Sequence, residues 1–104
     1  MKEITVLELH EKMQSGEAFI LVDVREGYEH EEFNIGGVNI PVTEIPHSTE
    51  RLKEMGDGDI VLYCRSGNRS GMAQKILSVQ FDMHNMVNLK GGMNAWKEEN
   101  LPPA

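Results

Sequence analysis

The sequence predicts a single α/β domain, residues 1–104, with a mostly parallel sheet. Short apolar runs alternate with segments of helical period along the chain, which is typical of strand–helix–strand units. The two strongest runs, 19–24 and 59–63, are almost continuously apolar, as expected for strands that are covered on both faces. No repeat, low-complexity tract or long linker divides the chain, so one hydrophobic core is expected.

The first half of the chain carries a local signal for each element. Residues 3–4 predict a short strand. Thr5, with Glu8 three residues later, predicts a capping box for a helix that ends near Gly16. The second strand is expected to lead into a short acidic helix over 26–33.

The second half continues the alternation. A short strand over 38–41 is expected to stop at its proline. Ser48 or Thr49 is expected to cap the next helix. After the strong strand at 59–63, a helix is expected to start near Ser70. The last expected elements are a strand over 86–89 and a helix that carries Trp96.

Composition excludes several classes of function. The formal net charge is −7, so the surface repels phosphate backbones and nucleic acid is not expected as a partner. No apolar stretch approaches the roughly 18 residues that span a membrane, and no signal peptide is recognisable, so a cytoplasmic protein without a membrane partner is expected. Cys64 is the single cysteine, and the histidines lack metal-ligand spacing, so neither a metal nor another cofactor is expected.

The most informative segment, residues 64–70, is a loop between a predicted buried strand and a predicted helix. In a parallel sheet this position is at the carboxyl ends of the strands, where such folds bind ligands. Glycine and asparagine in the loop permit unusual backbone angles, so that successive N–H groups can form an anion-binding nest. Its arginines add positive charge and fork-shaped donors. The segment reads Cys64-Arg65-Ser66-Gly67-Asn68-Arg69-Ser70.

The same features favour the thiolate form of Cys64. A helix N-terminus and nearby arginines both lower the pKa of a thiol, and the thiolate is the nucleophile. The loop is therefore expected to activate Cys64 as the catalytic residue, with Ser70 in support. The residues expected to bind an anionic substrate are Arg65, Ser66, Gly67, Asn68 and Arg69.

The segment 64–69 matches the pattern Cys-Arg-x-Gly-x-Arg and so resembles the active-site loop of the rhodanese-like domains. Three further stretches are similar to that family: Asp23-Val24-Arg25-Glu26, the residues 34–41, and the residues 88–96, which contain Gly-Gly-x-x-x-Trp. The resemblance covers nearly the whole chain. It implies a three-layer α/β/α domain with a parallel five-stranded sheet. The sequence departs from the family at Asn34, where a histidine is usual, and at Gln80, where a glycine is usual.

The resemblance also implies a reaction. Cys64 would take the outer sulfur of a small anionic donor such as thiosulfate, forming a persulfide that the loop amides hold. A thiol, a protein or, in the standard assay, cyanide would then accept the sulfur. Arg65 and Arg69 would hold the donor anion and stabilise the charge of the departing sulfite.

Other polar residues are interpreted as structural. Asp23 and Arg25 are expected to form an ion pair that braces the loop rather than to act in catalysis. The acidic run from 26 to 32, which includes Glu26, Glu29, Glu31 and Glu32, is interpreted as a solvated helix face.

Two alternative functions remain open. A phosphatase or arsenate reductase would also use a thiolate in an amide cradle, but its loop resembles Cys-x5-Arg, whereas the spacing from Cys64 to Arg69 is Cys-x4-Arg. A sulfur-carrier or partner-binding module would keep Cys64 but would lack turnover of free thiosulfate.

Overall fold

The computed structural model, which describes residues 1–104, contains one sheet in which all strand pairs are parallel. The spatial order of its five strands is β1-β5-β4-β2-β3, so β4 and β2, which correspond to the two strongest apolar runs, lie inside the sheet. The strands are β1 (Glu3–Ile4), β2 (Ile20–Asp23), β3 (Val38–Asn39), β4 (Ile60–Tyr63) and β5 (Met86–Leu89).

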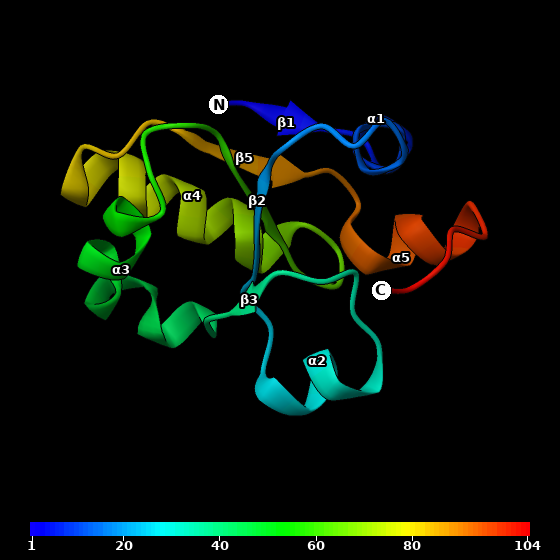
Figure 1. Ribbon diagram of the computed structural model, residues 1–104. Helices are drawn as coiled ribbons and strands as arrows, with labels where there is room; N and C mark the ends of the chain where they lie inside the picture. The colour runs from blue at the N-terminus through cyan, green and yellow to red at the C-terminus, as the bar shows by residue number, and fades with distance from the viewer.

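Helices cover both faces of this sheet, which confirms the three-layer prediction (Figure 1). Helices α1 and α5 pack on one face, and α3, α4 and the 3-10 helix η1 pack on the other. The short helix α2 lies beyond one end of the sheet (Figure 1). The helices are α1 (Val6–Gln14), α2 (Gly27–Glu32), η1 (Val42–His47), α3 (Thr49–Glu54), α4 (Asn68–Phe81) and α5 (Gly92–Glu98).

Strand β4 shows why its sequence is apolar throughout. Ile60 and Leu62 point into the core on the α4 side, whereas Val61 and Tyr63 point into the core on the α5 side. Alternate residues of a strand face opposite sides, so a strand with a helix layer on each side needs apolar residues at every position. The central strand thereby ends in the interior, and Cys64 follows it directly.

The expected capping box of α1 is present. Thr5 Oγ1 accepts from the Glu8 amide at 3.1 Å, and the Glu8 carboxylate accepts from the Thr5 amide at 2.9 Å. Ser48 precedes α3 as expected, but its hydroxyl donates back to the Glu44 carbonyl at 2.8 Å and does not cap the helix.

Two elements differ from the sequence-based prediction. The 3-10 helix over 42–47 was not predicted, because it contains Pro46 and presents few apolar positions. Helix α4 begins at Asn68 rather than near Ser70. The earlier start places both Arg69 and Ser70 in the first turn of the helix, next to the loop. The longest helix, α4, has 14 residues, and none of the helices could span a bilayer.

Candidate active site

Cys64 lies at the carboxyl end of β4, at the foot of a loop that leads into α4. Its side chain is buried, with 1% of the residue exposed. The loop turns into the helix at Gly67, whose φ of 98° is a left-handed conformation that glycine adopts without strain. This turn brings the loop backbone round to face the sulfur.

Donors from this turn converge on the sulfur. The Gly67 amide donates to Cys64 Sγ at 3.1 Å, and the Ser70 amide donates at 3.4 Å. The Ser70 hydroxyl also lies 3.4 Å from the sulfur. Because Ser70 is in the first turn of α4, its amide is free of helical partners and can point at the sulfur. The sulfur thus occupies the amide-lined end of a helix, where negative charge is favoured.

These contacts act against the burial of Cys64. Burial by itself raises the pKa of a thiol. The contact with the Ser70 hydroxyl and the hydrogen bonds from the amides of Ser70, Gly67 and Ser66 outweigh burial and lower the Cys64 pKa below its ordinary value. The geometry therefore favours the thiolate, which is the reactive form of cysteine.

Asn88, on the neighbouring strand β5, fixes this arrangement. Its Oδ1 accepts from the Ser70 hydroxyl at 2.5 Å, and its Nδ2 donates to the Gly67 carbonyl at 3.2 Å. Asn88 is itself buried. One side chain thus positions both residues that donate amides to Cys64. Asn88 entered the sequence analysis only within the stretch 88–96 that is similar to the family, because no local pattern marked it as a site residue.

The two loop arginines meet a carboxylate that the sequence analysis placed in solvent. Arg69 binds Glu29 through Nη1 to Oε1 at 2.7 Å and through Nη2 to Oε2 at 3.0 Å. Arg65 Nη2 lies 3.4 Å from Glu29 Oε2. Only 4% of Glu29 is exposed, so its interpretation as part of a solvated helix face was wrong. The remaining carboxylates of that run, at 26, 31 and 32, are exposed.

The ion pair changes the charge state of both partners. The hydrogen bonds from Arg69 hold the pKa of Glu29 at about 2 in spite of burial, so Glu29 is ionised at every pH at which the protein would work. The same contact raises the pKa of Arg69, and the charge of Cys64 contributes in the same direction. Glu29, Arg69 and Cys64 therefore belong to one electrostatic group.

Asp23 and Arg25 form the buried ion pair that the sequence predicted. Arg25 Nη2 lies 2.7 Å from Asp23 Oδ2, and its Nε donates to Asp23 Oδ1 at 2.9 Å. Arg25 also donates to the Phe33 carbonyl at 2.6 Å, and His30 Nδ1 lies 2.8 Å from Asp23 Oδ2. This network ties the C-terminal part of α2 to the end of β2. It fixes the helix that presents Glu29 to the loop and does not contact Cys64.

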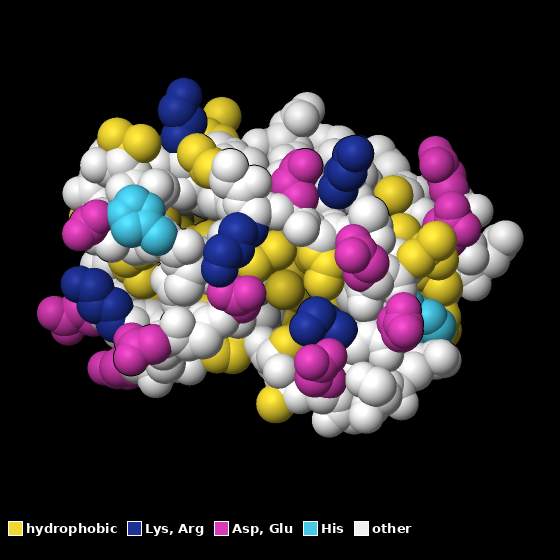
Figure 2. All heavy atoms as spheres, turned by 90° about the horizontal axis from the view of Figure 1, so that it is seen from above, with side chains coloured by type: hydrophobic (Ala, Val, Ile, Leu, Met, Phe, Trp, Pro, Cys, Tyr) yellow, Lys and Arg dark blue, Asp and Glu magenta, His cyan; other side chains and the backbone are white.

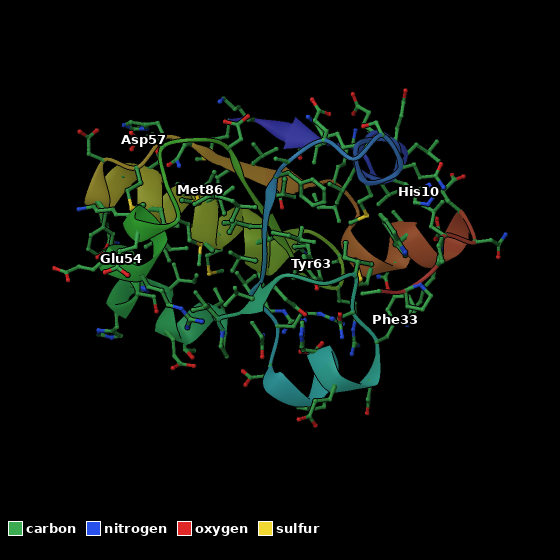
Figure 3. The ribbon with its side chains drawn as sticks, in the orientation of Figure 1. His10, Phe33, Glu54, Asp57, Tyr63 and Met86 are labelled. Carbon is green, nitrogen blue, oxygen red and sulfur yellow. The ribbon has the colours of Figure 1, made fainter.

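The other predicted loop residues lie on the outside. Ser66 and Asn68 are exposed, and the Asn68 amide donates to the Ser66 hydroxyl at 3.4 Å, which closes the turn before α4. Tyr63, labelled in the interior in Figure 3, packs beneath the loop and donates to the Gly36 carbonyl at 2.9 Å. Asn34, at the position where a histidine was expected, accepts from the Gly36 amide at 2.8 Å.

A hollow of about 430 Å³ lies beside the loop. It is bordered by Arg65, by Glu29 and Glu32 of α2, and by Asn94 and Lys97 of α5. Lys97 lies over the ring of Phe33 at 4.5 Å from its centroid.

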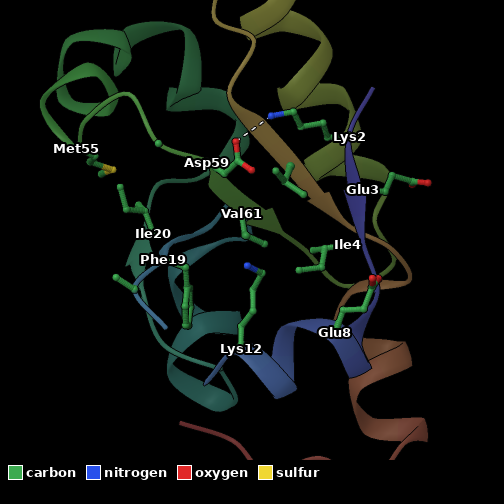
Figure 4. Close-up of a pocket in the computed structure, with 13 residues that line it drawn as sticks. Lys2, Glu3, Ile4, Glu8, Lys12, Phe19, Ile20, Met55, Asp59 and Val61 are labelled. Atoms are coloured by element: carbon green, nitrogen blue, oxygen red, sulfur yellow. Dashed lines mark hydrogen bonds and ion pairs between the residues drawn. The ribbon is translucent and has the colours of Figure 1, made fainter. Parts of the chain in front are cut away.

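A larger hollow, of about 680 Å³, lies at the opposite end of the sheet, where the strands begin. Figure 2 shows hydrophobic side chains gathered between charged ones on that face, and Figure 4 shows the hollow in close-up. Its lysines have acidic partners, Lys2 with Asp59 at 2.9 Å and Lys12 with Glu17 at 3.3 Å. It contains neither a cysteine nor a histidine, so the nucleophile of this chain lies elsewhere.

Known proteins share both the sequence and the fold. The chain is 40% identical over 103 residues to the Bacillus subtilis protein named "Putative sulfurtransferase YtwF", covering 98% of this chain and 96% of that protein. It is 34% identical to "Putative sulfur carrier protein YrkF" of the same organism, over 90% of this chain and 50% of that protein. The solved structure of a rhodanese-related protein from Thermoplasma volcanium superposes with a TM-score of 0.80 at 32% identity, covering 100% of this chain and 98% of the other.

The loop geometry and these relatives agree with a match to one protein family. Residues 5–99 match the family described as Rhodanese-like domain. That span includes the strands β2 to β5, the Cys64 loop, and the segments that carry Glu29 and Asn88. The chain therefore belongs to the family of rhodanese-like domains.

Proposed function

We propose that this protein is a sulfurtransferase in which Cys64 accepts a sulfane sulfur and carries it as a persulfide. The observation that carries the proposal is the set of donors around Cys64 Sγ, the amides of Gly67 and Ser70 at 3.1 and 3.4 Å. They stabilise a negative charge on sulfur without a neighbouring base. The relatives named as a sulfurtransferase and a sulfur carrier support transfer of sulfur by this family.

In the first half-reaction the Cys64 thiolate attacks the outer sulfur of the donor. With thiosulfate, a sulfur–sulfur bond forms to Cys64 while the bond between the two donor sulfurs breaks, and sulfite leaves with that electron pair. With a persulfide donor, a thiol leaves instead. In both cases the persulfide anion on Cys64 can remain in the same amide environment. Arg65 and Arg69 supply positive charge at the mouth of the loop.

In the second half-reaction an acceptor nucleophile attacks the outer sulfur of the Cys64 persulfide. The new bond joins that sulfur to the acceptor, and Cys64 leaves as the thiolate, ready for the next donor. The proposed acceptors are a low-molecular-weight thiol or a protein thiol. Cyanide, which yields thiocyanate, serves as the acceptor in an assay. No step requires a metal or an organic cofactor, because each half-reaction is a displacement at sulfur with its own leaving group: sulfite or a thiol in the first, and the Cys64 thiolate in the second.

A carrier function is the second candidate, and one relative's name favours it. The chain matches half the length of the protein named as a sulfur carrier. A carrier would form the same persulfide on Cys64 but would release it only to a dedicated protein. The two candidates share the first half-reaction and differ in the second.

The site favours sulfur over phosphate. A phosphatase requires an arginine that is free to bind the phosphoryl oxygens, and Arg69 is held at both nitrogens by Glu29. The loop is also one residue shorter than the Cys-x5-Arg loop, and nucleophilic catalysis tolerates little misplacement.

The direct test is incubation of the reduced protein with thiosulfate or with glutathione persulfide, followed by mass spectrometry of the peptide that contains Cys64. We expect the mass of one additional sulfur atom on Cys64, removed by cyanide or by dithiothreitol. Cys64→Ser is the control and should gain no sulfur. An unmodified Cys64 with both donors would contradict the proposed function.

A further inference from the structure

The positive charge that the loop offers to a substrate is already opposed by a carboxylate of the same chain. Glu29 binds Arg69 with two hydrogen bonds, at 2.7 and 3.0 Å, and lies 3.4 Å from Arg65. The two guanidinium charges therefore face one buried carboxylate and, in the reactive state, the Cys64 thiolate. Together these four groups are neutral.

Glu29 holds the two arginines to different degrees. The Arg69 side chain is 33% exposed and its planar fork is filled by both oxygens of Glu29, so it has little capacity for another anion. The Arg65 side chain is 64% exposed and touches Glu29 through a single long contact, so it can turn toward a substrate. A donor at Cys64 would meet one mobile guanidinium group rather than two.

Further contacts hold Glu29 in place for its ion pair with Arg69. Glu29 is anchored by its own helix, because its Oε1 accepts from the Glu26 amide at 3.1 Å. Arg25, held by Asp23, fixes the segment that follows α2 through the Phe33 carbonyl at 2.6 Å. To free Arg69, a competing anion would have to displace a buried, hydrogen-bonded carboxylate, which is costly because that charge would lose its partner.

We propose that Glu29 sets the donor preference of the site: it neutralises the loop arginines, disfavours small dianions such as thiosulfate, and leaves Cys64 to donors of the thiol-persulfide class. This proposal rests on the proposed function and names its substrate class. Thiosulfate carries two negative charges directly beside the sulfur that it transfers, whereas a persulfide carries at most one there. Glu29 acts through Arg65 and Arg69 and is therefore a positioning residue.

The test compares two donors with one readout. Single-turnover formation of the Cys64 persulfide is measured by mass spectrometry against the concentration of thiosulfate and of the persulfide of 2-mercaptoethanol, a thiol without charged groups. In Glu29→Gln the concentration of thiosulfate that gives half the maximal rate should fall about tenfold. The reason is that the substitution removes one negative charge that repels the thiosulfate dianion and neutralises the loop arginines. The value for the persulfide donor should stay within about twofold.

Glu32→Gln is the matched control. It removes a carboxylate from the same helix and the same hollow, but Glu32 forms no ion pair. In this control the donor concentration that gives half the maximal rate should change by no more than about twofold for either donor, since an exposed charge is well screened. An equal shift for both donors in Glu29→Gln, or the thiosulfate shift in Glu32→Gln, would overturn the proposal.

A second measurement does not depend on sulfur transfer. Alkylation of Cys64 by iodoacetamide is followed in the native protein with sodium sulfate or with sodium chloride at equal ionic strength. We expect equal rates, because Arg69 is bound to Glu29 and Arg65 alone does not hold the dianion. In Glu29→Gln, sulfate should slow alkylation, because both arginines are then available. Specific protection of the native protein by millimolar sulfate would overturn the role of Glu29. Failure of both donors to load Cys64 would instead count against the proposed function.

Discussion

The α-carbon of Gly92 faces the carbonyl oxygen of Cys64 so closely that a Cβ at Gly92 would lie 2.3 Å from that oxygen. Gly92 is the first residue of α5, and its close approach lets the helix dock on the loop. The Met93 amide donates to the Cys64 carbonyl and the Asn94 amide to the Arg65 carbonyl, both at 2.9 Å. The N-terminal amides of α5 therefore hold the backbone on the outer side of the nucleophile.

Gly92→Ala should disrupt the loop without removing any functional side chain. The new methyl group would press on Cys64 and Arg65, and the φ of 52° disfavours alanine. We expect a loss of about 1–3 kcal/mol in the free energy of unfolding, measured by urea denaturation, together with slower loading of sulfur on Cys64. Gly58→Ala is the control, because a Cβ there meets nothing within 4 Å. Native stability and loading in Gly92→Ala would contradict the described docking.

Ser70→Ala should make Cys64 less reactive at neutral pH. The substitution removes the hydroxyl that lies 3.4 Å from the sulfur and that lowers the Cys64 pKa, so this pKa should rise. The rate of alkylation by iodoacetamide near pH 7 should fall severalfold, because only the thiolate reacts.

The control for this prediction lies on the same helix. Ser78 contacts His84 at 2.9 Å, remote from the loop, so Ser78→Ala should leave the alkylation profile unchanged. If native Cys64 already titrates like a free thiol, near pH 8.5, the description of an activated thiolate is wrong.

The ion pair between Glu29 and Arg69 predicts a specific loss of stability in acid. The Glu29 pKa is about 2 in the folded protein against an ordinary value of 4.5. Its contribution to the free energy of unfolding is therefore complete above pH 4.5 and declines as the pH falls toward 2. Glu29→Gln should cost about 1.5–3 kcal/mol at neutral pH and flatten this part of the pH profile.

Urea denaturation between about pH 5 and 3 measures this slope. Glu32→Gln, which removes an exposed carboxylate of the same helix, should retain the native slope. A Glu29→Gln protein that loses stability in acid as steeply as the native protein would show that other carboxylates are responsible.

Arg69→Ala should affect anionic donors selectively. The substitution removes a positive charge near Cys64 and leaves the buried carboxylate of Glu29 with the single 3.4 Å contact to Arg65 as its remaining ion pair. The KM for thiosulfate should rise about tenfold and that for a persulfide donor much less. Lys75→Ala, which removes a charge from an exposed position of α4, should change neither KM. Equal increases for both donors would exclude an electrostatic role of Arg69.

The features that the sequence predicted correctly are those that depend on residues close together in the chain. Strand β4, the loop that follows it and the capping box at Thr5 each depend on neighbours in the chain, and each is present. The start of α4 was misplaced by two residues because Gly67 and Asn68 are poor helix formers, and the left-handed turn at Gly67 depends on the sulfur and Asn88.

Glu29 could not be assigned from local pattern, because its partner Arg69 is 40 residues away. A glutamate in an acidic, polar segment is usually exposed, and burial occurs only where the fold supplies a cation. The two loop arginines in a chain with a net charge of −7 were interpreted as a site for an anionic substrate. The sequence did not show that Glu29 would meet them. That information comes from the position of α2 beside the loop.

The most direct test of sulfur transfer through Cys64 is the release of thiocyanate from cyanide and a sulfur donor, compared between the native protein and Cys64→Ser. Thiosulfate and glutathione persulfide are each supplied as donor, with the reaction without protein subtracted. We predict turnover by the native protein, faster with the persulfide donor, and none above background in Cys64→Ser. Equal rates for the two proteins, or no release by native protein whose Cys64 remains open to alkylation, would contradict the account.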